Sequence, residues 1–149
     1  MSAVMRRCVI IGAANHLSYR DKDALEPYTP SGAGERLWDM VNLVHSVSKR
    51  DYVKAFTFVN LVPRGRWDAV KARELGPAMI DFVGSRHALV LGRDVWKALG
   101  FSPVRWFSRV TLMSSWTLLP HPSGRNRLYN EELMRRRVGK ILAAEGRWR

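Results

Sequence analysis

Short apolar runs alternate with amphipathic segments along this chain. Four runs have the length and composition of buried strands: Arg7–Gly12, Ala55–Leu61, His87–Gly92 and Ser115–Pro120. Apolar residues at helical spacing predict helices between and after them: Glu35–Val47, Asp68–Val83 in two pieces divided at Gly76-Pro77, Val95–Leu99, and a last helix capped by Asn130. Strands that alternate with helices predict an α/β fold, a three-layer α/β/α sandwich around a short, four-stranded parallel sheet.

Three polar segments follow predicted strands directly: Gly12–His16, Asn60–Arg66 and His121–Asn126. In a parallel sheet the carboxyl ends of the strands share one edge, and ligands bind beyond that edge. We therefore expect these segments to gather into one site. The polar stretch Asn15–Gly34 is long for a compact domain, so it is either a functional loop or holds structure that the pattern does not reveal.

Composition narrows the class of protein. The 149 residues predict one domain over 1–149, and 25 Lys and Arg against 13 Asp and Glu give a net charge of +12. Such a positive field favours nucleic acid as the partner. The single cysteine, Cys8, excludes a disulfide framework and a cysteine-based zinc cluster and fits the reducing cytoplasm. No apolar stretch is long enough to cross a bilayer, so we expect no membrane span. We also expect a cytoplasmic monomer, without metal or cofactor.

The segment His121-Pro-Ser-Gly-Arg-Asn carries the clearest chemistry. A neutral imidazole at a strand end can donate a hydrogen bond to an oxygen on which negative charge develops. Ser123 and the backbone amides around Gly124 can hold a phosphate, because small residues permit close approach. The alternative interpretation is an ordinary turn in which His121 only caps a strand.

The order of the motifs resembles the uracil-DNA glycosylase superfamily over nearly the whole chain. The resemblance rests on five segments: Val9-Ile-Ile-Gly12, Thr29-Pro-Ser-Gly-Ala-Gly-Glu-Arg-Leu37, Phe58-Val-Asn60-Leu-Val-Pro, Leu89-Val-Leu-Gly92 and His121-Pro-Ser-Gly-Arg-Asn. The branch with an iron–sulfur cluster and the single-strand-selective branch are the most similar, but the four cysteine ligands of that cluster are absent here.

The resemblance implies an enzyme that flips a base out of DNA and hydrolyses its N-glycosidic bond. Asn60 would read the Watson–Crick edge of the base, since a carboxamide offers a donor and an acceptor. His121 would donate to the pyrimidine O2 as the base leaves. Ser123 and Gly124 would grip the phosphate, and Arg125 or Leu128 would wedge into the vacated stack. Phe58 is either a base-stacking residue or, given its spacing from Asn60, part of the core.

The turn after the first strand departs from the family. There the family supplies an Asp, Asn or Glu that positions the attacking water, whereas this chain has Ala13 and Ala14. Asn15 could take the role if the turn is shifted by one residue. Asp21 or Asp23 could reach in from the following loop, although acids in such a loop are commonly solvated.

The same departure predicts a wide base pocket. With Ala14 in place of a larger group, and only His16 to fill part of the space, a pyrimidine with a bulky C5 substituent would fit. We therefore expect a modified pyrimidine as substrate, for example hydroxymethylated or glucosylated cytosine as in some bacteriophage DNA, and a role in defence against phage.

Further residues are candidates for DNA contact. Arginines would ring the same edge of the sheet: Arg64, Arg66, Arg125 and Arg127, with Asn126 between the last two. Trp67 is the best candidate for an aromatic residue that faces DNA. The run Arg135–Arg137 either reaches the DNA backbone or is a solvated helix face. The histidines show no metal-ligand spacing.

Two other classes of function stay open. A nucleic-acid-binding protein of the same fold that has lost catalysis would explain Ala13 and Ala14, but it leaves Asn60 and His121 without a role. An α/β enzyme acting on a nucleotide or nucleoside would explain the pocket, but not the net charge of +12.

Overall fold

The computed structural model describes residues 8–14, 25–28, 32–63, 65–122 and 127–148. These residues form eleven elements in chain order: β1 (Cys8–Ala14), α1 (Ala33–Asn42), α2 (Lys49–Ala55), β2 (Phe56–Val62), α3 (Ala69–Val83), β3 (His87–Leu91), α4 (Arg93–Ala98), β4 (Arg109–Thr111), β5 (Ser115–Leu119), the 3-10 turn η1 (Arg127–Asn130) and α5 (Glu132–Gly146). The predicted α/β class is confirmed.

The described strands form one mixed sheet of five, in the order β2-β1-β3-β5-β4. The four predicted strands, β1, β2, β3 and β5, are parallel to one another, whereas β4 pairs antiparallel with β5. The expectation of a four-stranded, all-parallel sheet is therefore wrong. Strand β4 has three residues and no buried side chain, so it lacks the apolar pattern by which a strand is detected in the sequence.

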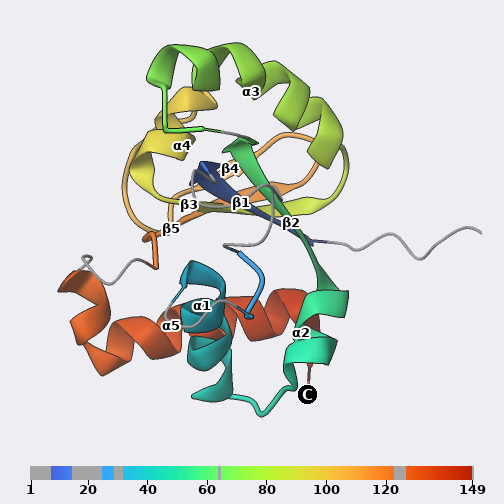
Figure 1. The fold of residues 1–149 in the computed structure, drawn as a ribbon, viewed down its shortest axis with the longest axis vertical. Helices are drawn as coiled ribbons and strands as arrows, with labels where there is room; N and C mark the ends of the chain where they lie inside the picture. The colour runs from blue at the N-terminus through green and yellow to red at the C-terminus, as the bar shows by residue number, and fades with distance from the viewer. Residues whose placement is uncertain (1–7, 15–24, 29–31, 64, 123–126, 149) are drawn as a thin grey trace, which may run out of the picture.

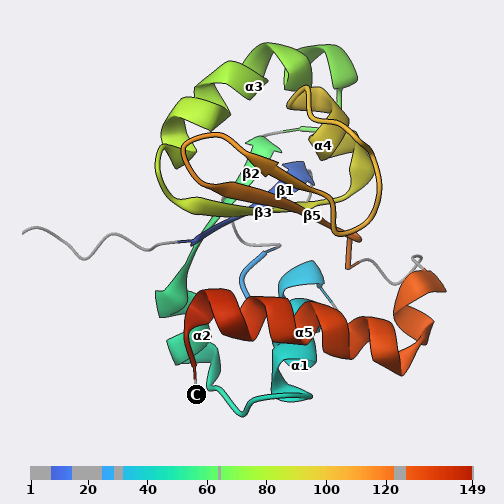
Figure 2. The ribbon, with the colours of Figure 1, turned by 180° about the vertical axis from the view of Figure 1, so that it is seen from behind.

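Helices cover both faces of the sheet. Figures 1 and 2 show α3 and α4 on one face and α1, α2 and α5 on the other. Alternate residues of β1 face the two layers. Cys8 and Ile10 lie in the core beneath α1 and α5, while Val9 and Ile11 lie in the core beneath α3 and α4. A strand buried on both faces reads as a continuous apolar run, which is why β1 was detectable from the sequence.

The predicted helix over Glu35–Val47 ends earlier, at Asn42, and a further helix that the sequence pattern did not predict, α2, follows at Lys49–Ala55. The carboxamide of Asn42 ends α1, since its Nδ2 donates to the Trp38 carbonyl at 2.8 Å and its Oδ1 accepts from the Val47 amide at 3.1 Å. Ser48 then caps α2 by accepting from the Asp51 amide at 3.1 Å.

Two other helix boundaries also differ from the prediction. α3 continues through Pro77 instead of dividing there, and a Cβ on the preceding Gly76 would lie 3.2 Å from the carbonyl oxygen of Ala98. This close packing against α4 supports the helix at the point where Gly-Pro predicted a break. Asn130 lies in η1, and Glu131, not Asn130, occupies the N-cap of α5.

Candidate functional site

The next two strands after β1 in the chain, β2 and β3, are added to the sheet on opposite sides of β1. The connection from β1 to β2 runs through α1 and α2 on one face, and the connection from β2 to β3 runs through α3 on the other face (Figure 1). Strands β2 and β3 consequently lie on opposite sides of β1. Ligands of open α/β sheets bind in the crevice at the carboxyl ends of such a strand pair.

Asn60 lies at this edge, paired in register with Gly12 of β1. Its side chain is only 5% exposed, and its oxygen Oδ1 lies 2.5 Å from the point that a Cβ on Gly12 would occupy. Asn60 shares the face of β2 with Phe56 and Phe58, so its carboxamide points into the layer of α1 and α5. The absence of a side chain at Gly12 makes the space for this amide.

His121 follows β5 at the same edge. Its Cβ lies 3.5 Å from the position of a Cβ on Gly92, the residue that joins β3 to α4, and the Gly92 amide donates to the Leu119 carbonyl at 2.8 Å. Burial lowers the pKa of His121 below its ordinary value, so the imidazole is neutral at neutral pH. A neutral, half-buried imidazole is suited to donate to an oxygen that gains negative charge.

A chain of hydrogen bonds holds the backbone next to His121. The hydroxyl of Tyr129 in η1 donates to the carbonyl oxygen of Pro120, and Arg135 Nη1 donates to the Tyr129 carbonyl at 2.5 Å. Burial raises the pKa of Tyr129, so this hydroxyl keeps its proton and stays a donor. Helix α5 is thereby connected, through η1, to the residue that precedes the candidate catalytic histidine.

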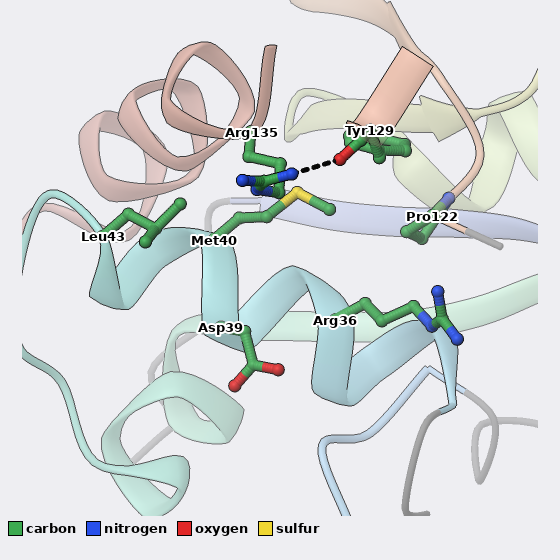
Figure 3. Close-up of a pocket in the computed structure, with 7 residues that line it drawn as sticks. All are labelled: Arg36, Asp39, Met40, Leu43, Pro122, Tyr129 and Arg135. Atoms are coloured by element: carbon green, nitrogen blue, oxygen red, sulfur yellow. Dashed lines mark hydrogen bonds between the residues drawn. The ribbon is translucent and has the colours of Figure 1, made fainter. Parts of the chain in front are cut away.

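A cavity of about 200 Å³ adjoins this corner of the molecule (Figure 3). Its lining combines apolar side chains with Tyr129 of η1 and with charged groups from α1 and α5: Arg36, Asp39, Met40, Leu43, Pro122, Tyr129 and Arg135. In Figure 3, Arg36 extends from α1 toward Pro122, whereas the carboxylate of Asp39 points away from Tyr129. Two half-buried arginines line this cavity, Arg36 near Pro122 and Arg135 beside Tyr129, and their charges favour an anionic ligand, such as a phosphate.

Two other predicted site residues, Phe58 and Ala14, lie apart from this corner. Phe58 is 3% exposed and packs against Tyr52 and Phe56, with ring centroids 5.7 and 6.1 Å away, so it is a core residue and its ring is not available to stack on a base. Ala14, at the end of β1, packs against the core on the side of α3 and α4. Arg66 and Arg127 are exposed, so both can meet a ligand from solvent.

Several predicted residues fall outside the described ranges. They are Asn15, His16, Asp21, Asp23, Arg64, Ser123, Gly124, Arg125 and Asn126. The candidates for positioning water and most of the predicted phosphate grip belong to this group. Their roles stay predictions.

Sequence reasoning missed the roles of Arg36, Tyr129 and Arg135. Arg36 lies in one of the segments on which the resemblance rests, but nothing there distinguishes it from other helix-surface residues, and Arg135 is one of a run of three arginines. The structure brings them together through the packing of α1 against α5 and the return of η1 to Pro120.

Comparison with family models and with curated proteins gave no match to this chain. Among the described residues, no three His, Cys, Asp or Glu side chains gather as they would to hold a metal ion. Within the same ranges, no helix has the length and apolar character that crossing a membrane requires.

Proposed function

We propose that this protein is a DNA glycosylase of the uracil-DNA glycosylase superfamily that removes a pyrimidine base and leaves an abasic site. The observation that carries the proposal is the placement of two close pairs, Gly12 with Asn60 and Gly92 with His121, at the same carboxyl edge of the sheet. These positions are the ones that the sequence motifs of the family share with this chain, and the net charge of +12 suits a polyanionic substrate.

Two residues of the described ranges, Asn60 and His121, act directly on the base in this mechanism. The buried carboxamide of Asn60 reads the Watson–Crick edge of a flipped pyrimidine, because it offers both a donor and an acceptor. The neutral imidazole of His121 donates to the O2 of the base as the glycosidic bond breaks and the base departs as an anion. A water molecule then adds to the sugar carbon, with Asn15 or Asp21 as the proposed residue that positions it.

The proposed substrate is a C5-substituted pyrimidine, such as a hydroxymethylated or glucosylated cytosine, or else uracil. The basis of this proposal is the sequence, in which Ala13 and Ala14 stand where the family has larger polar side chains; the structure packs both against the core on the side of α3 and α4. A protein that removes such bases would act in defence against phage with modified DNA.

The decisive experiment incubates the purified protein with DNAs that carry uracil, hydroxymethyluracil, hydroxymethylcytosine or glucosylated hydroxymethylcytosine. Alkali or an abasic-site endonuclease then reveals strand breaks. We expect breaks in at least one DNA, and His121→Ala to lower the rate by about 10²–10³-fold, as the loss of one charge-stabilising donor does. Asn60→Ala should cost as much or change the preferred base. Efficient removal of plain uracil with C5-substituted bases untouched would refute the modified-base proposal.

A second candidate function is nucleic-acid binding without catalysis. The apolar Ala13 and Ala14, at the place where the family positions water, favour it. DNA binding without strand breaks in any of the four DNAs would select this function over the first.

A further inference from the structure

A second cavity, of about 240 Å³, lies between α3 and α4 on the other face of the sheet. It is lined by Trp67, Ala69 and Arg73 at the start of α3 and by Asp94, Lys97 and Ala98 of α4. Both helices begin at the carboxyl edge of the sheet, because α3 follows β2 and α4 follows β3. This cavity therefore lies toward the same edge of the sheet as Asn60 and His121, but on the face that α3 and α4 cover.

One aromatic ring, that of Trp67, and two cationic side chains line this cavity. Trp67 is half-buried and packs against the core beneath α3 and α4, so its ring is held in place. Arg73 and Lys97 are exposed at the cavity, and Arg73 Nε donates to the Ala69 carbonyl at 3.3 Å, which keeps its side chain along the first turns of α3. The close approach of Gly76 to the carbonyl oxygen of Ala98, which also lines the cavity, sets the spacing of the two helices.

An aromatic ring flanked by two cations is the arrangement by which proteins bind unpaired nucleotides. The ring stacks on a base face, while the cations meet the phosphates on either side. A base inside a duplex has both faces covered by its neighbours and cannot stack on a protein ring. Asp94 adds an acceptor for the amino groups of a base.

We infer that this cavity binds one unpaired nucleotide of single-stranded DNA that flanks the nucleotide held at His121. The inference rests on the proposed function, and it makes unpaired DNA the preferred substrate. Trp67 stacks on the flanking base, and Arg73 and Lys97 bind its phosphates.

The test is a fluorescence-anisotropy titration of the protein with a labelled oligothymidylate strand and with a blunt duplex of equal length. The variants are Trp67→Ala, Trp67→Phe and the double variant Arg73→Ala/Lys97→Ala. Matched controls are Phe82→Ala, an exposed aromatic residue at the far end of α3, and Lys54→Ala, an exposed cation in the last turn of α2 before β2 begins.

We expect Trp67→Ala to weaken binding of the single strand by about tenfold or more, and binding of the duplex by less than about twofold. Trp67→Phe should retain most of the affinity, because it keeps a stacking ring. The double variant should reduce the log–log salt slope for the single strand by about 1.4, as the loss of two phosphate contacts predicts. The two controls should bind as the unaltered protein does.

Single-strand affinity of Trp67→Ala equal to that of Phe82→Ala would overturn the inference. If Trp67→Ala does not fold, an unchanged salt slope in the double variant overturns it instead. If the unaltered protein excises bases and Trp67→Ala binds the single strand normally, the cavity proposal fails and the glycosylase proposal stands. If Trp67→Ala loses affinity for the single strand and the unaltered protein excises no base from any DNA, the glycosylase proposal fails and the cavity proposal stands.

Discussion

At the scale of single residues, Gly12 makes the position of Asn60 possible. A Cβ at Gly12 would lie 2.5 Å from Asn60 Oδ1 and 3.1 Å from Leu25 Cδ2, so Gly12→Ala must displace the carboxamide. We expect the excision rate to fall about as far as in Asn60→Ala. In the double variant Gly12→Ala/Asn60→Ala the space is vacant, and the two losses should not add. Single-turnover rates of the three variants measure this coupling, and additive losses would contradict it.

Tyr129 is expected to act by positioning His121. In Tyr129→Phe the buried Pro120 carbonyl loses its donor, which costs about 1–3 kcal/mol of stability and loosens the backbone next to His121. We expect kcat to fall while KM changes little, and the loss to vanish in a His121→Ala background. Tyr52→Phe is the matched control, because its buried hydroxyl has no hydrogen-bond partner within the described part of the chain. That variant should be neutral or more stable, and equal kcat in the two tyrosine variants would exclude the positioning role.

The burial of His121 also makes stability depend on pH. Burial lowers its pKa in the folded chain, so the unfolded chain binds the proton more readily. Above the unfolded pKa of about 6.5 both states carry a neutral imidazole, and the fold has its full stability. As pH falls below that value, the unfolded chain gains a proton that the folded chain binds less well, so the free energy of unfolding decreases. Urea unfolding of the unaltered protein and of His121→Gln from about pH 7 to pH 5 tests this. The unaltered protein should lose more stability on acidification, and a constant difference between the two proteins would contradict the burial effect.

At the scale of elements, the crossing of α1 and α5 depends on Gly139. A Cβ there would lie 2.1 Å from the carbonyl oxygen of Met40, and backbone cannot move aside as a flexible side chain can. Gly139→Ala should therefore destabilise the fold by about 1–3 kcal/mol, although the same change in an exposed helix stabilises it. Gly76→Ala, with its nearest contact at 3.2 Å, should cost less. Urea midpoints with unchanged m-values measure both, and a more stable Gly139→Ala would refute the close crossing.

Strand β4 and the end of α1 could not be predicted from the sequence pattern. Strand β4 is held by its pairing with β5, in which Arg109 faces Thr117 and Thr111 faces Ser115. None of its own three residues is buried, so only the partner strand identifies it. The end of α1 at Asn42 likewise depends on side-chain bonds that compete with the helix, whereas the apolar spacing alone continues to Val47.

At the scale of the whole molecule, the net charge of +12 predicts a strong dependence of DNA affinity on salt. A protein that meets about five phosphates should show a log–log slope of about −4 to −5 on duplex DNA. Titrations of the same duplex from low to moderate salt measure the slope. A flat response would favour an enzyme that acts on a free nucleotide or nucleoside over either nucleic-acid function.

The sequence by itself determined the α/β class, the four parallel strands and the edge of the sheet on which Gly12, Asn60 and His121 lie. These features follow from apolar runs and from the residue that ends each run, which are properties of neighbours along the chain. Only the tertiary structure decided that Phe58 is core, that Tyr129 holds the backbone before His121 and that a cavity lined by Trp67 opens between α3 and α4. The reason is physical: each of these depends on the close approach of residues far apart in sequence, which no local pattern encodes.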